Sequence, residues 1–344
     1  MQALRTLRAV HSGEPVDMLI PEPLSPDEVL VRVVAAGLAD HDLQVDEWSP
    51  SQAFMTEGLP VTLGHEFVGR VETGPQRGQR VVVRPSVTCG RCVACVQGRQ
   101  DDCEHRSSIS LVRDGTFDPW VRVPLRNCVP IPSTLSDELA ALAEPMSMAM
   151  QALRVAGAVR GLRVLVMGPG PIGQSIAVLA RRAGAAQVVV SGFGDAAHFG
   201  VLRRMGFEAV IDQAEGDLAT LALPHTGGAE FDLVIEATGV PETIHDALPL
   251  LRRDGVVVVA GIHARPLSLD LTRLVRRQHQ VRGSFRPPEA DWPQTLLLLG
   301  ELAGLIGPMV SHVQPLPQAG GGRAQQAYGS LAGKMLLRRR SCND

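Results

Sequence analysis

Residues 163–173 read Arg163-Val-Leu-Val-Met-Gly-Pro-Gly-Pro-Ile-Gly173, and they predict a strand that runs into a glycine-rich turn. The apolar run Arg163–Met167 is typical of a buried strand. After it, Gly168, Gly170 and Gly173 have the G-x-G-x-x-G spacing of a dinucleotide-binding turn. In such a turn the first glycine permits the bend, the second lets the backbone approach a pyrophosphate, and the third lets the helix pack on the strand.

The residues around this turn alternate between strand and helix patterns, which predicts an α/β fold with a doubly wound parallel sheet. Strands are expected over residues 163–167, 187–191, 231–237 and 255–261, and helices over residues 172–183 and 199–205. The first helix is expected to begin at Ile172, directly after Pro171, and the free N–H groups and positive dipole end of its N-terminus suit an anion. The last fifty residues read as mixed, Gly/Pro-interrupted sequence that ends in a strand-like segment, residues 333–337.

The end of the second strand bears on the choice of cofactor. NAD enzymes place an acidic residue there for the ribose 2′-OH, but this chain has Ser191 and Gly192, and Asp195 comes a few residues late. Without that carboxylate a 2′-phosphate is not repelled, so NADP(H) is favoured over NAD(H), although Asp195 could still reach back. The cations expected to be able to approach such a phosphate are His198, Arg203 and Arg204.

Four cysteines form a second motif, C-x2-C-x2-C-x7-C. Such close spacing brings four thiolates to one tetrahedral Zn²⁺, and four protein ligands leave no open position, so this zinc is expected to be structural. The ligands would be Cys89, Cys92, Cys95 and Cys103, in a lobe over residues 86–106, with Cys128 and Cys342 standing apart. Metal explains this pattern better than disulfides in an oxidising compartment do.

Composition narrows the class of protein. The chain has 344 residues, 45% of them hydrophobic, and a net charge of −3, which suits about two domains with substantial cores. The near-neutral charge gives no sign of a basic surface that would bind nucleic acid. Neither a signal peptide nor a membrane span is recognisable. A cytoplasmic protein is therefore expected. Because Tyr328 and Lys334 are the only tyrosine and the only lysine, a Tyr-x-x-x-Lys catalytic pair and a Walker lysine are excluded.

Several motifs, in order along nearly the whole chain, resemble the zinc-containing medium-chain dehydrogenases and reductases. They are residues 37–42, 64–69 and 78–81, the four cysteines, residues 143–145, the glycine turn, residues 236–239 and residues 333–337. The resemblance implies a GroES-like β-barrel domain from residues 1–152 and 288–344 and a Rossmann domain from residues 153–287. It also implies a homodimer or homotetramer, with Thr238 and Lys334 at the cofactor, the latter at its pyrophosphate.

The catalytic zinc of that family is where this sequence departs from the pattern. Matched to members similar to sorbitol dehydrogenase, two ligands are present as His65 and Glu144, but the cysteine position holds Ala39. His41 falls on the position of the hydroxyl proton relay. Asp42 matches the aspartate that orients the metal-binding histidine.

Three outcomes follow for this centre. Asp40 or His41 takes the missing ligand position, or Glu66 moves in beside its neighbour His65, or the metal is lost. In the last case His41, Asp42 or His65 supplies the proton directly. Loss is favoured, because two ligands alone hold Zn²⁺ weakly.

The expected function is hydride transfer between a nicotinamide cofactor and a small alcohol or carbonyl substrate, with zinc or a histidine acting on the carbonyl oxygen. One alternative is a zinc-independent reductase of an activated C=C or imine bond. Another is a non-redox enzyme or a dinucleotide-binding regulatory protein on the same fold. The residues expected to line the substrate pocket indicate only its size and apolarity, and they are Trp48, Phe54, Phe117, Trp120 and Met148.

Overall fold

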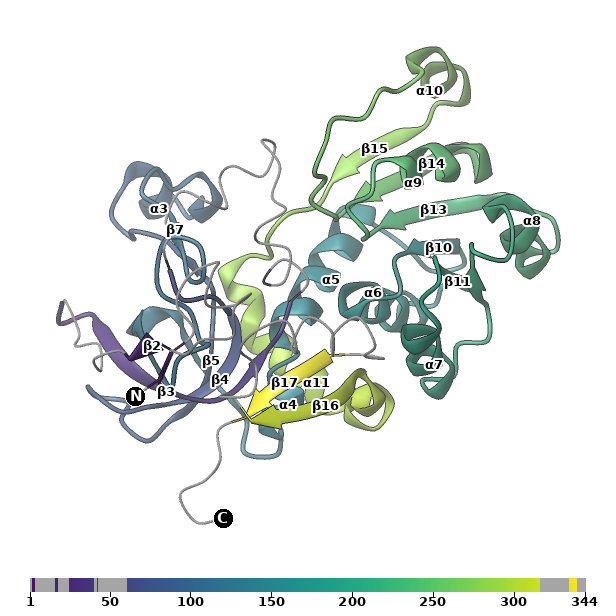
Figure 1. Ribbon diagram of the computed structural model, residues 1–344. Coiled ribbons are helices and arrows are strands. Elements are labelled where there is room, and N and C mark those ends of the chain that lie inside the picture. Colours follow the sequence, from purple (N-terminus) through teal and green to yellow (C-terminus); the bar gives the residue numbers. More distant parts are fainter. Residues whose placement is uncertain are drawn as a thin grey trace. The chain divides into compact units, whose positions relative to one another are not determined.

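The structure, a computed structural model, describes residues 2–3, 16–17, 25–39, 42, 61–315 and 334–338. These residues fall into two compact units (Figure 1). The first holds the described residues up to Glu144 and again from Pro288, and the second spans Pro145–Pro287. Several residues of interest in the sequence lie outside the described part, namely Asp40, His41, Trp48, Phe54, Tyr328 and Cys342.

The second unit is built on a six-stranded parallel sheet in the order β12-β11-β10-β13-β14-β15. Its strands are β10 (Arg163–Met167), β11 (Gln187–Gly192), β12 (Val210–Asp212), β13 (Phe231–Glu236), β14 (Leu251–Val259) and β15 (Gln280–Gly283). Its helices are α6 (Pro171–Arg182), α7 (Ala196–Arg204), α8 (Leu218–Ala222), α9 (Glu242–Ala247) and α10 (Leu271–Arg277), with short 3-10 turns η5 (Leu223–Thr226) and η6 (Leu248–Leu250). The predicted doubly wound sheet is confirmed. Its strand order reverses beside β10, so the topological switch point lies there.

Valine and leucine runs explain why these strands are central. Val164, Leu165, Val166 and Met167 of β10 are all inaccessible to solvent, as expected for a parallel strand covered on both faces. The helix after β10 begins at Pro171, whose fixed φ and missing N–H suit the first helical position. Two strands escaped the sequence prediction: β12 is only three residues long, and β15 is mostly exposed, so neither has the apolar run of a central strand.

The first unit contains a mostly antiparallel sheet in the order β16-β17-β3-β4-β5-β9, with β8 paired to β3. Its strands are β3 (Glu28–Gly37), β4 (Glu66–Val71), β5 (Arg80–Val83), β8 (Trp120–Pro124), β9 (Cys128–Pro130), β16 (Val310–Pro315) and β17 (Lys334–Arg338). Two short pairs complete the strands, β1 (Gln2–Ala3) with β2 (Val16–Asp17), and β6 (Ser86–Val87) with β7 (Ser107–Ser108). Alternate apolar residues of β3, β4, β5 and β8 form its core.

Helices α3 (Val93–Val96), α4 (Asp137–Ala140) and α11 (Trp292–Ile306) belong to this unit, with η3 (Gln100–Asp102), η4 (Leu125–Asn127), η7 (Glu289–Asp291) and η8 (Gly307–Met309). The boundary between the units falls within helix α5 (Ala143–Ala156). The sequence interpretation missed α11, because its run of four leucines has no clear helical period. In the structure Leu296, Leu299 and Leu302 are buried on one face. None of the described helices is both long and apolar enough to cross a membrane.

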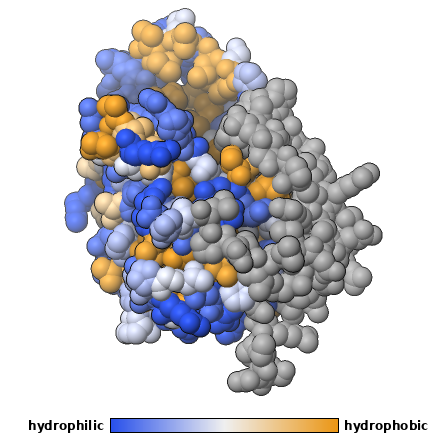
Figure 2. Space-filling model, turned by 90° about the vertical axis from the view of Figure 1, so that its left-hand side faces the viewer, coloured by the Kyte–Doolittle hydropathy of each residue, from blue (hydrophilic) through white to orange (hydrophobic). Residues whose placement is uncertain are grey.

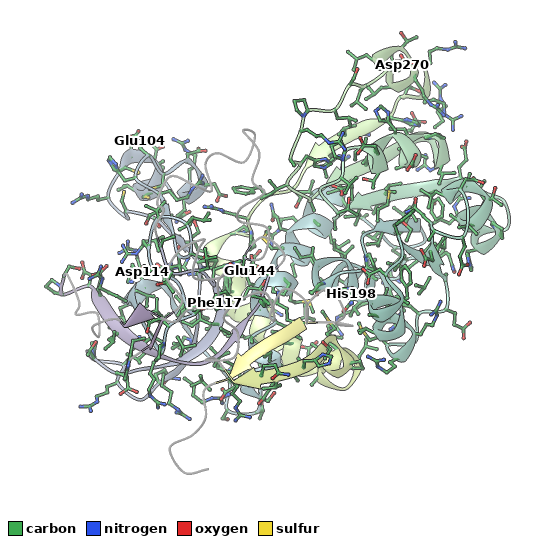
Figure 3. All side chains as sticks on the ribbon, viewed as in Figure 1. Glu104, Asp114, Phe117, Glu144, His198 and Asp270 are labelled. Atoms are coloured by element: carbon green, nitrogen blue, oxygen red, sulfur yellow. The ribbon has the colours of Figure 1, made fainter. Side chains whose placement is uncertain are left out.

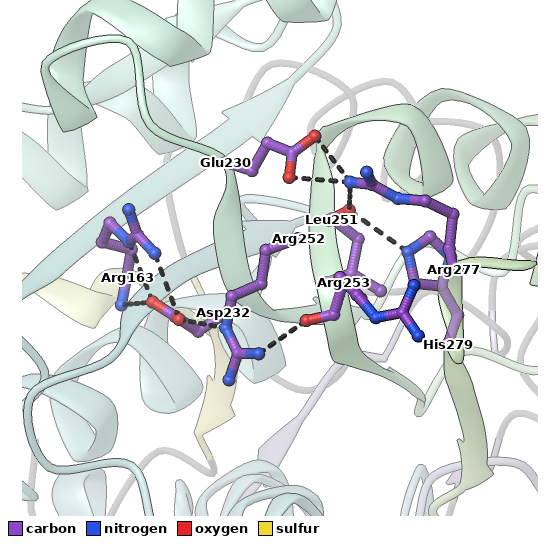
Figure 4. Close-up of polar contacts among 8 residues, drawn as sticks. All are labelled: Arg163, Glu230, Asp232, Leu251, Arg252, Arg253, Arg277 and His279. Atoms are coloured by element: carbon purple, nitrogen blue, oxygen red, sulfur yellow. Dashed lines mark hydrogen bonds and ion pairs between the residues drawn. The ribbon is translucent and has the colours of Figure 1, made fainter.

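A network of arginines and carboxylates holds the amino ends of the parallel strands (Figure 4). Asp232 on β13 accepts hydrogen bonds from Arg163 at 2.9 Å and from Arg252 at 2.5 Å. Beside it Arg277 donates to Glu230 and to the backbone oxygen of Leu251. Burial alone would raise the pKa of Asp232, but the two arginines outweigh burial and lower this pKa to about 2.

The unfolding free energy should therefore depend on Asp232 at acid pH. A carboxyl with a lowered pKa in the folded state contributes stability above its unfolded pKa of about 4, and this contribution is lost as the pH falls toward 2. We expect a loss of about 2 kcal/mol over that range. In denaturant unfolding measured from pH 5 to pH 2.5, the free energy of unfolding should decrease less for Asp232→Asn than for the wild type.

The control for this experiment is the exposed pair of Glu242 and Arg265, whose side chains lie 2.6 Å apart and are both more than half accessible. Solvent screens such pairs, so Glu242→Gln should change the loss of unfolding free energy at acid pH much less. Identical acid profiles for Asp232→Asn and the wild type would contradict the assignment of this stability to Asp232.

Candidate functional site

The turn after β10 gives its three glycines three different surroundings. Gly168 has a φ of +108°, in the region that favours glycine, and its N–H donates to the backbone oxygen of Ser191 at 2.9 Å. A Cβ on Gly173 would lie 1.8 Å from the oxygen of Gly168, so this position seals the helix against the turn. A Cβ on Gly170 would meet nothing within 4 Å. The turn therefore has open space at Gly170, where a ligand can approach the backbone.

The amino end of α6 faces this open space with its donors uncapped. Gly170 is the N-cap residue and no side chain caps the helix. Gln174 instead donates from Nε2 to the oxygen of Pro169 at 2.8 Å, which braces the turn from its buried side. The first N–H groups and the positive end of the helix dipole remain available to an anion such as a pyrophosphate.

Ser191 and Gly192 end β11 as predicted, next to this turn. Ser191 is fully buried, and a Cβ on Gly192 would lie 2.7 Å from the ring of Pro169, so the glycine allows the turn to pack on the strand. Asp195 does not reach back toward them. It caps α7, and its Oδ1 lies 2.7 Å from Nδ1 of His198 (Figure 3 labels His198).

Helix α7 bears on the other two predicted phosphate cations. Arg203 and Arg204 are its last residues, about 12 Å along the axis from Ala196, and their contact with a phosphate stays a prediction. Sequence reasoning missed the carboxylate of Asp212, at the end of β12. Its Oδ1 accepts from the N–H of Gly194 at 2.7 Å, so this carboxylate lies close to the end of β11. Only knowledge of the β11–β12 pairing could have revealed it.

The motif at residues 236–239 is held by a buried carboxylate. Glu236 ends β13, and its Oε1 accepts from the hydroxyl of Thr238 at 2.6 Å and from the N–H of Gly239 at 2.8 Å. Its Oε2 lies 3.0 Å from Nε2 of His263, which follows β14. This contact ties two loops at the carboxyl edge of the sheet and fixes Thr238 there. The contribution of His263 was not visible in the sequence.

The four predicted zinc cysteines come together in the first unit. Their sulfurs all lie within 4.8 Å of one another, on residues Cys89, Cys92, Cys95 and Cys103. The sulfurs of Cys89 and Cys95 are 3.9 Å apart, about twice the length of a disulfide bond. All four are free thiols. The arrangement has the donor set and the spacing of a closed tetrahedral metal site.

Backbone N–H groups around this loop favour thiolates. Hydrogen bonds from the N–H groups of Arg91 and Cys92 lower the pKa of Cys89 to about 6. The N–H of Cys95 likewise lowers the pKa of Cys92, whereas burial raises the pKa of Cys95. Two thiols are thus prepared to bind metal as anions, and a bound cation would favour deprotonation of the others.

A second group of potential ligands lies elsewhere in the same unit. Ligand atoms of His65, Glu66 and Glu144 all lie within 4.8 Å of one another. His65 and Glu66 are buried where β4 begins, and Glu144 lies in the first turn of α5 (Figure 3). One imidazole and two carboxylates make three ligands of a type that binds divalent cations.

The predicted cofactor lysine lies against this group. Nζ of Lys334 is 2.6 Å from Oε2 of Glu66, and both side chains are almost inaccessible, at 2% and 4% exposure. Strand β3 lies between β17 and β4, and Gly37 on it leaves room for the pair. A Cβ there would lie 2.4 Å from the Glu66 oxygen and 2.8 Å from Cε of Lys334.

Asp42 lies behind His65, and its role in orienting that ring stays a prediction. It is fully buried, and its Oδ1 lies 4.0 Å from Nδ1 of His65. The N–H groups of Ala39 and Gly64 donate to its two oxygens at 3.1 Å and 3.3 Å. Gly64 has a φ of +92°, and a Cβ there would lie 2.7 Å from the ring of Phe117. Phe117 (Figure 3) is itself 2% exposed and belongs to the core, so its predicted place in the pocket lining is wrong.

Comparison with known proteins covers both units. Residues 25–133 match the family model for the alcohol dehydrogenase GroES-like domain, and residues 171–301 match that for zinc-binding dehydrogenases. An L-threonine 3-dehydrogenase of Coxiella burnetii is 30% identical over 324 residues, 90% of this chain and 92% of that protein. A D-arabitol-phosphate dehydrogenase of Enterococcus avium is 28% identical over 91% of this chain and 92% of its own length.

Among solved structures, a zinc-binding dehydrogenase from Sinorhizobium meliloti 1021 bound to NADP is similar along its whole length. The TM-score is 0.82 at 29% identity, and the match covers 98% of each chain. The predicted pairing of a GroES-like domain with a doubly wound parallel-sheet domain is confirmed by these matches.

Proposed function

This chain belongs to the zinc-binding dehydrogenase family, and from that premise we propose that it transfers hydride between a nicotinamide cofactor and a small alcohol or carbonyl substrate. The observation that carries the proposal is the open space at Gly170 beside the uncapped end of α6, at the switch point of the parallel sheet. We further propose that Pro145–Pro287 is the dinucleotide-binding domain. The remaining described residues would form the GroES-like catalytic domain.

We propose that the four cysteines hold one structural Zn²⁺, since the donor set is closed and leaves no position for a substrate. Four free, metal-binding thiols also suit a reducing compartment, and we propose the cytoplasm.

The second centre is proposed to bind metal more weakly. We infer from the resemblance that Ala39 occupies the position of a cysteine ligand, and Glu66 is the described residue that can complete the set with His65 and Glu144. Lys334 competes for Glu66, because their ion pair must be weakened before that carboxylate can serve a metal fully. A bound Zn²⁺ would polarise the carbonyl oxygen of the substrate. His65 would hold it, and Asp42 would orient His65.

Metal analysis should separate the two centres. We expect freshly purified protein to hold about one Zn²⁺ per chain tightly and any second equivalent to leave first during dialysis against a mild chelator. Cys92→Ser should remove the tight equivalent and lower thermal stability, whereas Glu66→Gln should affect only the weak one. Protein without tightly bound zinc, or with disulfides among the four cysteines, would refute the structural site.

We propose NADP(H) as the preferred cofactor. Residues 191–194 carry no carboxylate, the carboxylate of Asp195 is already used by the cap of α7 and by His198, and that of Asp212 accepts the N–H groups of Gly194 and Ala214. We propose that His198, whose Nδ1 lies 2.7 Å from Oδ1 of Asp195, is the side chain of α7 that contacts a 2′-phosphate. The similar dehydrogenase from Sinorhizobium meliloti was solved with NADP, which supports the same choice.

The assay that tests the function is NADPH or NADH oxidation with a panel of aldehydes, ketones and enones, and the reverse reaction with L-threonine, polyols and polyol phosphates. Turnover of an alcohol and carbonyl pair is expected. Turnover of enones alone, in protein without the second metal, would instead identify a zinc-independent reductase, which Ala39 and the Lys334–Glu66 pair favour as the second candidate. Binding of NADPH without any turnover would indicate a non-redox or regulatory protein.

We also propose that the protein is a homodimer or homotetramer. Strand β15 ends the described parallel sheet, so one side of it has no strand partner among the described residues. Apolar side chains are exposed near it, at Leu271, Val275 and Val281. Figure 2 shows a face on which hydrophilic and hydrophobic residues are interspersed. Unpaired strand edges are commonly covered by a second copy, and light scattering after size-exclusion chromatography measures the assembly directly.

A further inference from the structure

We propose that Ser110 is a positioning residue that holds His65 through Asp42 and Gly64, an inference that rests on the proposed role of His65. Ser110 is 1% exposed and lies in the loop after β7. Its φ is +76°, in the left-handed region that L-residues with a Cβ rarely adopt. A glycine would adopt this conformation without strain, so the backbone alone gives no reason for a serine here. The reason must lie in the contacts of the serine side chain.

The hydroxyl of Ser110 connects two elements behind His65. Its Oγ accepts the N–H of Gly64 at 3.0 Å and donates to Oδ1 of Asp42 at 3.4 Å. The same Asp42 oxygen lies 3.3 Å from the N–H of Gly64 and 4.0 Å from Nδ1 of His65. One side chain thus fixes both the residue that precedes His65 and the carboxylate that faces its ring.

The surrounding loop holds Ser110 where it is needed. Its N–H donates to the oxygen of Arg113 at 2.8 Å, which closes a turn. The next residues then pair with the segment before His65, since the N–H of Gly115 donates to the oxygen of Thr62 and the N–H of Thr116 donates to the oxygen of Gly64. A strained residue persists only where its neighbours determine it in this way, and such residues concentrate at functional sites.

The chemical consequence concerns the tautomer of His65. A carboxylate facing Nδ1 favours the proton on that nitrogen and leaves Nε2 free to bind a metal or act on a substrate oxygen. Ser110 supports this choice by holding the Asp42 oxygen in place. Without the hydroxyl, Asp42 keeps the N–H groups of Ala39 and Gly64, but Oδ1 loses its O–H donor and Gly64 loses its second acceptor, so the carboxylate and the ring are less firmly oriented.

The test compares Ser110→Gly with Ser110→Ala. Both remove the hydroxyl, but only glycine relieves the left-handed backbone, so Ser110→Gly should melt at a higher temperature than Ser110→Ala. If Ser110 positions His65, both variants should lose kcat by a similar factor of about tenfold, with the dissociation constant of NADPH unchanged. If Ser110 matters only for folding, Ser110→Gly should keep wild-type kcat, and that result would overturn the proposal.

Asp254→Gly is the matched control, since Asp254 is also left-handed, with a φ of +60°, but is exposed and lies in the other unit. It should gain stability without change in kcat.

A second readout does not need turnover. The ¹⁵N chemical shifts of His65, assigned from a His65→Gln spectrum, should show the Nδ1–H tautomer in the wild type and a mixture in both Ser110 variants. An unchanged tautomer in both variants would refute the proposal even if no substrate were found. Absence of turnover in the wild type would instead count against the proposed function alone.

Discussion

Replacing His65 by alanine is expected to lower kcat by about 100-fold or more and to leave the dissociation constant of NADPH within about twofold. The residue acts at the carbonyl end of the reaction, whether its ring holds a metal or serves the proton directly. It lies in the first unit, whereas the dinucleotide turn lies in the second. Steady-state kinetics on a proven substrate and a fluorescence titration with NADPH measure the two quantities.

His312→Ala is the control for this substitution, because His312 lies on β16 in the same unit and is exposed. It should keep wild-type kcat. Glu144→Ala should also reduce kcat, through loss of a ligand or of its charge beside His65. Wild-type kcat in both the His65→Ala and Glu144→Ala variants would mean that this centre is only an inherited part of the fold.

Substituting Gly170 by valine should weaken dinucleotide binding by at least about 100-fold while the protein stays folded. The backbone at Gly170 is extended, with φ −67° and ψ −179°, which any residue adopts. The new side chain would meet no protein atom near its Cβ, so the loss of the glycine cap costs about 1 kcal/mol at most. The valine would instead fill the space through which a pyrophosphate approaches the helix.

Gly173→Ala provides the contrast, since its Cβ would lie 1.8 Å from the oxygen of Gly168 and should destabilise the domain itself. Circular dichroism and isothermal titration distinguish the two effects. A Gly170→Val protein that binds NADPH as tightly as the wild type would show that the dinucleotide does not use this turn.

Most of the fold was predictable because its signals are local. Strands β10, β11 and β13 were placed within one residue, since each is a short apolar run beside glycine or polar residues. Helix α11 was missed because its apolar residues are nearly continuous, and β12 because three residues carry no pattern.

The residues of the candidate site were predictable where they belong to a short sequence motif. They were not predictable where the contact joins strands that are distant in the sequence. The four cysteines and the glycine turn needed only spacing. The contact of Lys334 with Glu66 depends on the neighbouring order of β17, β3 and β4, which no local pattern encodes. The left-handed backbone of Ser110 is likewise set by its loop rather than by its residue type, so the sequence offered no signal for it.

The burial of Lys334 has a practical consequence for chemistry on this protein. It is the only lysine in 344 residues, and its ammonium is covered and paired with Glu66. Amine-directed fluorophores and cross-linkers should therefore leave Lys334 unmodified in the folded protein. Lysine acylation followed by mass spectrometry would then report the separation of β17 from β3, because Lys334 becomes reactive only when that strand pairing opens.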